Sequence, residues 1–125
     1  MTHMLMCNAP VHLLDSIAEI SASDTGCVVI SGSHAGLSAA QYAIAARPLL
    51  CVFNDAGVGR DEAGIAGLVL LEQRGLAACA VSHMSAHIGV AASTFEAGII
   101  SHANARAFAL GVSIGQQVRS LATDH

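Results

Sequence analysis

The chain has 125 residues, which is enough for one domain with its own hydrophobic core. Only 11% of the residues are charged and 54% are hydrophobic, whereas globular chains carry about 25% charge. This balance excludes a disordered chain and a long coiled coil. The net charge is −4, with five arginines and no lysine. So few basic residues exclude a protein that binds the phosphate backbone of nucleic acids. The absence of lysine excludes a Schiff-base mechanism and a Walker A loop.

The predicted elements alternate between helical and extended segments. A helical spacing of apolar residues over 11–20 comes first, and a turn at residues 24–26 follows it. Short apolar runs predict strands at 27–31, 49–53, 77–82 and 98–101. Helices are expected at 37–46, 61–74, 103–110 and 113–121, with Ser113 as the cap of the last one. The segment 85–96 stays open between a helix broken at Gly89 and a loop.

Strands that alternate with helices of about ten residues are typical of βαβ units. We therefore predict a single α/β domain over residues 1–125, with residues 1–9 as a mobile N-terminus. The expected architecture is a small three-layer Rossmann- or flavodoxin-like fold. About four parallel strands would form its sheet, with helices on both sides.

The composition also predicts the cellular compartment and the oligomeric state of the protein. No stretch reaches the roughly 18 apolar residues of a membrane span, and the first residues lack the pattern of a signal peptide. We therefore expect a cytoplasmic protein with reduced thiols, and we expect Cys27, Cys51 and Cys79 to be buried within apolar strands. Low charge and a mean hydropathy of +0.60 predict a homo-oligomer that covers part of its apolar surface.

Polar pairs follow all four predicted strands. Ser33-His34, Asn54-Asp55, Ser82-His83 and Ser101-His102 stand at equivalent places. Because the carboxyl ends of parallel strands meet at one edge of a sheet, we expect these residues to converge there, where α/β proteins bind ligands. The alternative is that these side chains only cap helices and satisfy loop backbone groups.

Histidine exchanges protons near neutral pH, so three histidines beside one carboxylate point to acid–base chemistry. The expected catalytic residues are His34, Asp55, His83 and His102. Asp55 would orient or neutralise the imidazoles. The same histidines are also suitable ligands for one divalent metal, so the cofactor is either none or one such ion. No dinucleotide motif is present.

The expected substrate-binding groups surround these four residues. Ser33 and the amides of the glycine-rich turn would bind an oxyanion or phosphate at a helix N-terminus, and two arginines would bind a carboxylate or phosphate. The full expected set is Gly32, Ser33, Gly36, Asn54, Arg60, Asn104 and Arg106.

Three stretches are similar to the ribose-5-phosphate isomerase B group: CVVISGSHAGLSAAQYAI, then LLCVFND, and later HANARAFALGVSIG. The resemblance implies a small Rossmann-like α/β fold. It implies no catalytic residues here, because the loop that carries the family's catalytic cysteine reads SGSHAG in this chain.

These observations predict an enzyme, either an isomerase, a lyase or a hydrolase, that acts by histidine-centred proton transfer. Its substrate would be a small polar or anionic molecule. The alternative is a non-catalytic module that binds a ligand or a metal, or an accessory subunit of a larger enzyme. Neither reading involves a nucleic acid or a membrane.

Overall fold

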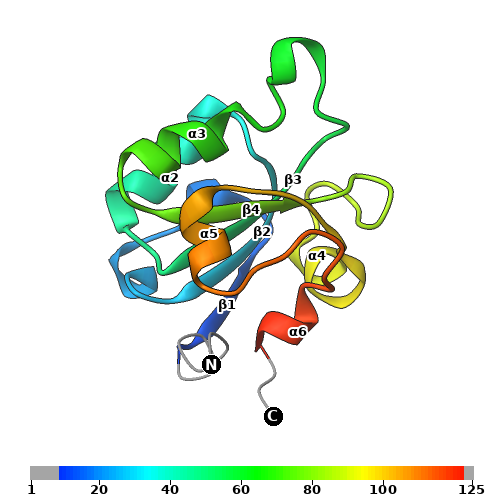
Figure 1. Cartoon of the computed structure of the whole chain (residues 1–125). Helices are drawn as coiled ribbons and strands as arrows, with labels where there is room; N and C mark the ends of the chain where they lie inside the picture. The colour runs from blue at the N-terminus through cyan, green and yellow to red at the C-terminus, as the bar shows by residue number, and fades with distance from the viewer. Residues whose placement is uncertain (1–8, 123–125) are drawn as a thin grey trace.

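The computed structural model describes residues 9–122, and the expected mobile N-terminus lies, apart from Ala9, outside them. Within this range five strands form one sheet, with helices on both sides (Figure 1). The strands are β1 (Val11–Leu14), β2 (Val28–His34), β3 (Leu50–Asn54), β4 (Ala77–Val81) and β5 (Ile100–Ala103). The helices are α2 (Leu37–Ala46), α3 (Ala66–Gln73), α4 (Ala91–Ala97), α5 (Ala105–Ala109) and α6 (Arg119–Ala122). Three 3-10 turns complete the set: η1 (Ile17–Glu19), η2 (Ala22–Asp24) and η3 (Arg60–Glu62).

The strands lie side by side in chain order, from β1 to β5. The first four are parallel, and β5 pairs with β4 in the antiparallel sense. The predicted α/β class is therefore confirmed, and the sheet is mostly parallel. The expected sheet of about four parallel strands differs in two ways: β1 adds a strand, and the strand expected at 98–101 is β5, which is antiparallel. The narrower Rossmann- or flavodoxin-like expectation is not confirmed, because those sheets reverse their strand order at a central point and this sheet does not.

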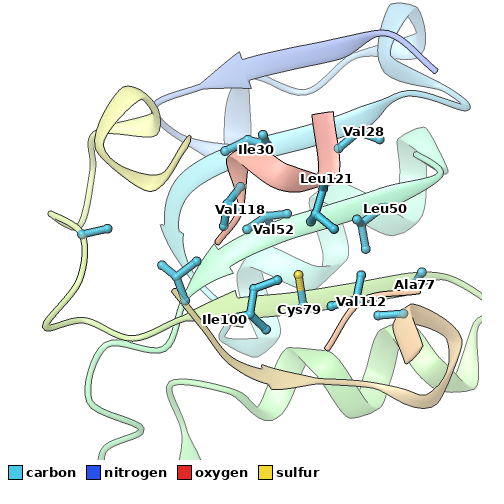
Figure 2. Close-up of a cluster of buried hydrophobic side chains, with 13 residues drawn as sticks. Val28, Ile30, Leu50, Val52, Ala77, Cys79, Ile100, Val112, Val118 and Leu121 are labelled. Carbon is cyan, nitrogen blue, oxygen red and sulfur yellow. The ribbon is translucent and has the colours of Figure 1, made fainter. Parts of the chain in front are cut away.

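Alternate residues of the central strands supply the cores on the two faces of the sheet. Val28, Ile30 and Val52 belong to one core cluster, which also takes in Leu121 of α6 (Figure 2). Val29 and Phe53 belong to the other, together with side chains of α2 and α3. Because both faces are covered, the central strands are continuous apolar runs, which is why the sequence predicts them.

The unreversed strand order explains which helices cover which face. Right-handed connections between strands that advance in one direction place all their helices on the same side. In keeping with this, α2 and α3 pack against each other over one face. The opposite face is covered by segments that follow β4, with α4 packed against β1 and β2, and with α5 against β4.

The expected helix at 11–20 is wrong: its first part is β1 and its second part is η1. Local side-chain bonds compete with a continuous helix here. The hydroxyl of Ser16 accepts the amide of Ala18 and caps η1. Ser21 and Asp24 form a reciprocal capping box around η2.

Three further expected helices are shorter than predicted, and the one expected at 103–110 spans only Ala105–Ala109 as α5. In the segment 61–74, η3 comes first and α3 begins only at Ala66, because Asp61 and Glu62 adopt left-handed φ angles of 55° and 59°. The helix expected from Ser113 begins only at Arg119. Before it, Gln117 forms an antiparallel bridge with Ile99 instead.

The three cysteines of the apolar runs, Cys27, Cys51 and Cys79, are buried free thiols, as expected. Across residues 9–122, no helix is both long enough and apolar enough to span a bilayer.

Candidate functional site

Asp55 stands at the centre of the candidate site, directly after β3. Its backbone amide donates to the carbonyl of Val81, which holds it at the carboxyl end of β4. Its Oδ1 accepts the amide of Gly57 at 2.8 Å, which closes a tight local turn. The residue is only 5% exposed, so its carboxylate depends on protein donors rather than on water.

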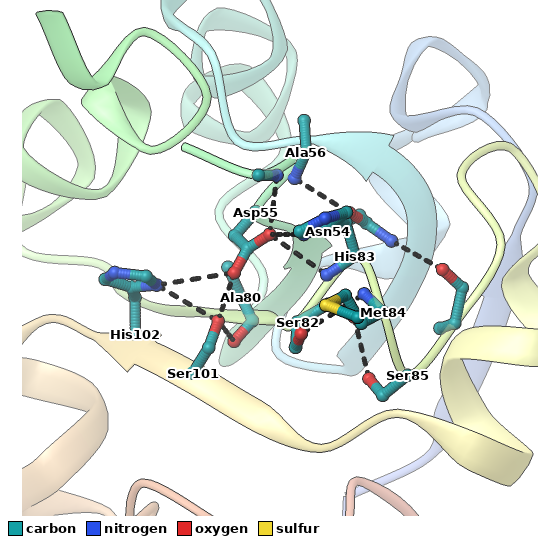
Figure 3. Close-up of polar contacts among 12 residues, drawn as sticks. Asn54, Asp55, Ala56, Ala80, Ser82, His83, Met84, Ser85, Ser101 and His102 are labelled. Carbon is teal, nitrogen blue, oxygen red and sulfur yellow. Dashed lines mark hydrogen bonds and ion pairs between the residues drawn. The ribbon is translucent and has the colours of Figure 1, made fainter. Parts of the chain in front are cut away.

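Two histidines approach this carboxylate from different segments (Figure 3). The backbone amide of His83 donates to Oδ1 at 3.0 Å, and the ring Nδ1 of the same residue lies 3.3 Å from that oxygen. The ring Nδ1 of His102 lies 3.7 Å from Oδ2. A single buried carboxylate therefore lies close to Nδ1 of both imidazoles.

Ser101 completes the cluster. Its hydroxyl lies 2.7 Å from Oδ2 of Asp55, to which it donates, and 3.0 Å from Nδ1 of His102. Ser101 was not among the predicted site residues. The recurrence of serine before His34, His83 and His102 is the signal that could have identified it.

The antiparallel direction of β5 brings Ser101 and His102 to this place. The amide of Ser82 donates to the carbonyl of Ile99, so the chain enters β5 at the edge where β4 ends. The predicted convergence of Asp55, His83 and His102 is therefore observed, although the reason given for His102, the carboxyl end of a parallel strand, is wrong.

Hydrogen bonds keep the Asp55 side chain ionised. Burial raises the pKa of this carboxyl, but donation from Ser101, from the amides of Gly57 and His83, and from the His83 ring lowers it by more. The net effect is a pKa below the usual aspartate value. Asp55 is thus an anion at neutral pH that faces two imidazoles.

Both imidazoles combine an anchored nitrogen with an accessible ring. The side chain of His83 is 48% exposed and that of His102 is 36% exposed. In each ring Nδ1 faces Asp55. Within residues 9–122, Nε2 has no hydrogen bond or ion pair in either ring, so it is the atom left to meet a ligand.

Asn54, expected to bind substrate, is fully buried and holds loops together instead. Its Oδ1 accepts the amide of Ala56, and its amide group donates to the carbonyl of Ala86. These bonds tie the segment after β3 to the segment after β4. They position Asp55 and His83 relative to each other.

The glycine-rich turn after β2 also uses its polar groups internally. The amide of Gly32 donates to the carbonyl of Asp15, and the hydroxyl of Ser33 accepts the amide of Ile17. The expected oxyanion donor at Gly32 is therefore engaged within the protein, and the Ser33 oxygen serves there as an acceptor. Gly36 starts α2 as its N-cap.

His34 pairs with Asn54 at the same sheet edge, but its side chain does not join the cluster. It ends β2 with an exposed side chain, and its ring rests against Gly36. Within residues 9–122, no hydrogen bond or ion pair joins it to Asp55, His83 or His102. The expected convergence of a third histidine is therefore not observed.

The two arginines occupy different regions. Arg60 is exposed in η3, on a segment that projects from the body of the domain (Figure 1). Arg106 lies on α5, where its amide and its Nε approach the carboxylate of Glu72 at 3.0 and 3.9 Å. It lines a hollow with Gly75 and Ala77, at the start of β4. The expectation that Arg106 lies at the carboxyl edge is therefore wrong.

Asn104 is likewise placed at the opposite edge and is buried. Its side chain accepts the amides of Ala78 and Ala107, and it donates to the carbonyls of Leu68 and Leu76. Every polar atom of its side chain is satisfied inside the protein. The antiparallel direction of β5 carries residue 104 away from Asp55, although Asn104 still lines a groove that reaches His102.

In the described range, no group of three or more His, Cys, Asp or Glu side chains is arranged to hold a metal ion. In particular, the suggested trio of His34, His83 and His102 is not brought together, because His34 stays outside the cluster.

The comparisons with known proteins identify no relative: no family model, no curated protein and no solved structure matches the chain. They therefore give no support to the resemblance to the ribose-5-phosphate isomerase B group.

Proposed function

We propose that the protein is an enzyme that acts on a small molecule by proton transfer at the carboxyl edge of the parallel strands. The observation that carries this proposal is the contact of one buried carboxylate, that of Asp55, with Nδ1 of both His83 and His102. Nδ1–H of His83 can donate to this carboxylate, and Nδ1–H of His102 can donate to the Ser101 hydroxyl that is bonded to it. Either arrangement leaves Nε2 as the basic nitrogen, and the nearby carboxylate stabilises the imidazolium that forms when Nε2 takes a proton.

Two imidazoles beside one carboxylate allow two roles. Asp55 is close enough to both rings to stabilise the imidazolium that forms in either one. Such a trio removes a proton from a substrate with one Nε2 and returns a proton with the other, as isomerases, lyases and hydrolases require.

The test is turnover of a panel of small esters, amides, hydroxy acids and sugars by the wild type and by variants. We expect His83→Ala, His102→Ala and Asp55→Asn each to reduce turnover by about 100-fold or more. His87→Ala is the matched control, because this exposed histidine lies on the same loop as His83 and, among the described residues, only its backbone groups are bonded, to Ser93 and Val90.

Full turnover in His102→Ala or in His83→Ala would contradict the proposal. Ligand binding without turnover, undiminished in the folded His102→Ala protein, would support the non-catalytic module instead. Amide spectra of each variant show whether the fold is intact.

We also propose a homo-oligomer. The loop between β4 and α4 exposes three large apolar side chains: Met84 at 85%, Ile88 at 53% and Val90 at 43%. Contiguous exposed apolar side chains are typical of protein contacts. Sedimentation of the wild type and of a Met84→Asp, Ile88→Asp variant tests it, and a monomeric wild type contradicts it.

A further inference from the structure

An open groove lies directly beside the candidate site. It has a volume of about 450 Å³, within the range of small-molecule sites. Its walls come from α3 with its N-cap, from α5 and from the segment before α6. The apolar side chains that line it are those of Ile65, Leu68, Val69, Phe108 and Ile114.

The groove ends at the catalytic candidates. Ser101 and His102 line it, and both contact Asp55. A molecule in the groove therefore lies against the imidazole of His102. Three of the lining side chains are well exposed without a ligand: Val69 at 61%, Ile114 at 54% and Phe108 at 48%. An apolar ligand group would remove this surface from water.

The charges around the groove disfavour an anion. The carboxylate of Glu72 lines it, and Asp55 is an anion at the end where His102 lies. No arginine is found among the described residues that line it, and the chain has no lysine. Arg106 interacts with Glu72 but lines the adjacent hollow rather than the groove.

We propose that the substrate is a small uncharged amphipathic molecule, with an apolar group of aromatic or short aliphatic character joined to a neutral polar group. The apolar group lies between Val69, Phe108 and Ile114, and the polar group meets Nε2 of His102. The proposal deepens the proton-transfer function above and rests on it. It replaces the anionic substrate expected from the sequence.

The test is an amide NMR titration with three probes: phenylacetamide, its anionic counterpart phenylacetate, and acetamide, which lacks the ring. We expect phenylacetamide to shift the groove residues and His102 in a saturable way. Phenylacetate should bind about tenfold more weakly because of the two carboxylates, and acetamide should bind more weakly because it buries little apolar area. Val69→Asp should weaken phenylacetamide binding about tenfold.

Leu37→Asp is the matched control, because Leu37 is 56% exposed on α2 and does not line the groove. Phe108→Ser is a second groove variant, should Val69→Asp not fold. Equal or tighter binding of phenylacetate, no saturable shifts in the groove, or undiminished binding in the groove variants would overturn the proposal.

The two proposals fail separately. Turnover that requires His102, without phenylacetamide binding, overturns the substrate class and leaves the proton-transfer function standing. Groove binding of phenylacetamide, with turnover undiminished in His102→Ala, overturns the function and leaves the groove as a ligand site.

Discussion

The hydroxyl of Ser101 donates a 2.7 Å hydrogen bond to Oδ2 of Asp55, across 46 positions of the sequence. This bond joins the edge strand β5 to the loop after β3. It also places Ser101 3.0 Å from Nδ1 of the neighbouring His102. A small side chain thus sets both the ionisation of the buried carboxylate and the position of one imidazole.

Replacing Ser101 by alanine should therefore raise the pKa of Asp55, because the main side-chain donor to the carboxylate is lost. A ¹³C titration of the Asp55 carboxyl measures this shift. The free energy of unfolding should fall by about 1–2 kcal/mol. Ser38→Ala is the control, since Ser38 is exposed on α2. An unchanged pKa of Asp55 in Ser101→Ala would show that the bond does not stabilise the anion.

A second buried carboxylate predicts how stability depends on pH. Asp24 is 4% exposed, and burial raises its pKa, but the His12 ring at 2.6 Å and the amide of Ser21 lower it by more. Because the folded pKa lies below the unfolded value of about 3.9, the stabilisation is complete above that pH and is lost as pH falls through the folded pKa.

Asp24→Asn should therefore destabilise the protein by about 1–3 kcal/mol at pH 7, and the difference from the wild type should shrink below about pH 4. Urea unfolding at pH 7 and pH 3 measures both values. Asp61→Asn, at an exposed position, should show no such dependence. An equal loss of unfolding free energy at pH 7 and at pH 3 would show that the ionised carboxylate of Asp24 is not the cause of the stabilisation.

Gly32 allows the loop before α4 to pack onto β2. A Cβ at this position would lie 2.4 Å from the backbone nitrogen of Val90, and the carbonyl of Gly32 accepts the amide of Gly89 at 2.7 Å. Gly32→Ala should therefore cost about 1–3 kcal/mol, measured by thermal or urea unfolding. At Gly36 the nearest atom is in the exposed His34 ring, which can turn aside, so Gly36→Ala should be tolerated. Equal costs at the two glycines would exclude this steric explanation.

Asn104 should prove structural. Removing its side chain leaves the carbonyls of Leu68 and Leu76 and two amides without their partners, so Asn104→Ala should cost about 2–4 kcal/mol. Asn104 lines the groove beside His102, but its polar atoms are all engaged inside the protein, so turnover per folded molecule should stay unchanged. A loss of turnover in the folded variant would show that Asn104 takes part in the site.

The buried cysteines should be inert in the folded protein. Burial raises the pKa of Cys79 to about 12. Burial also raises the pKa of Cys51, and the nearby Cys79 raises it further. Only the thiolate is nucleophilic, so a disulfide reagent at pH 8 should leave both unmodified. In a Cys7→Ser background, three thiols should react after unfolding in guanidinium chloride. Rapid reaction of Cys51 or Cys79 in the folded state would show that the strands open.

Part of the site was predictable from local sequence. Asp55 and His83 each follow a strand that is buried on both faces, and such strands are unambiguous apolar runs. The predicted helix at 37–46 has the same bounds as α2, because alanines favour a helix and Pro48 prevents its continuation. His34 also stands at the end of a buried apolar strand, but its ring does not reach the cluster.

Other features depended on contacts between distant segments. The pattern at 11–20 suits a helix, yet Val11 pairs with Val28 in the sheet. Asn104 and Arg106 looked equivalent to the residues after the other strands. Their strand runs in the opposite direction, which no local pattern records.

The sequence by itself determined the α/β class, the buried central strands and the polar residues that follow them, because burial on both faces and turn chemistry act within a few residues. The tertiary structure alone decided the direction of β5, the link from Ser101 to Asp55 and the groove beside His102. Each of these arises from long-range pairing, in which backbone groups far apart in the chain satisfy one another and carry their side chains together.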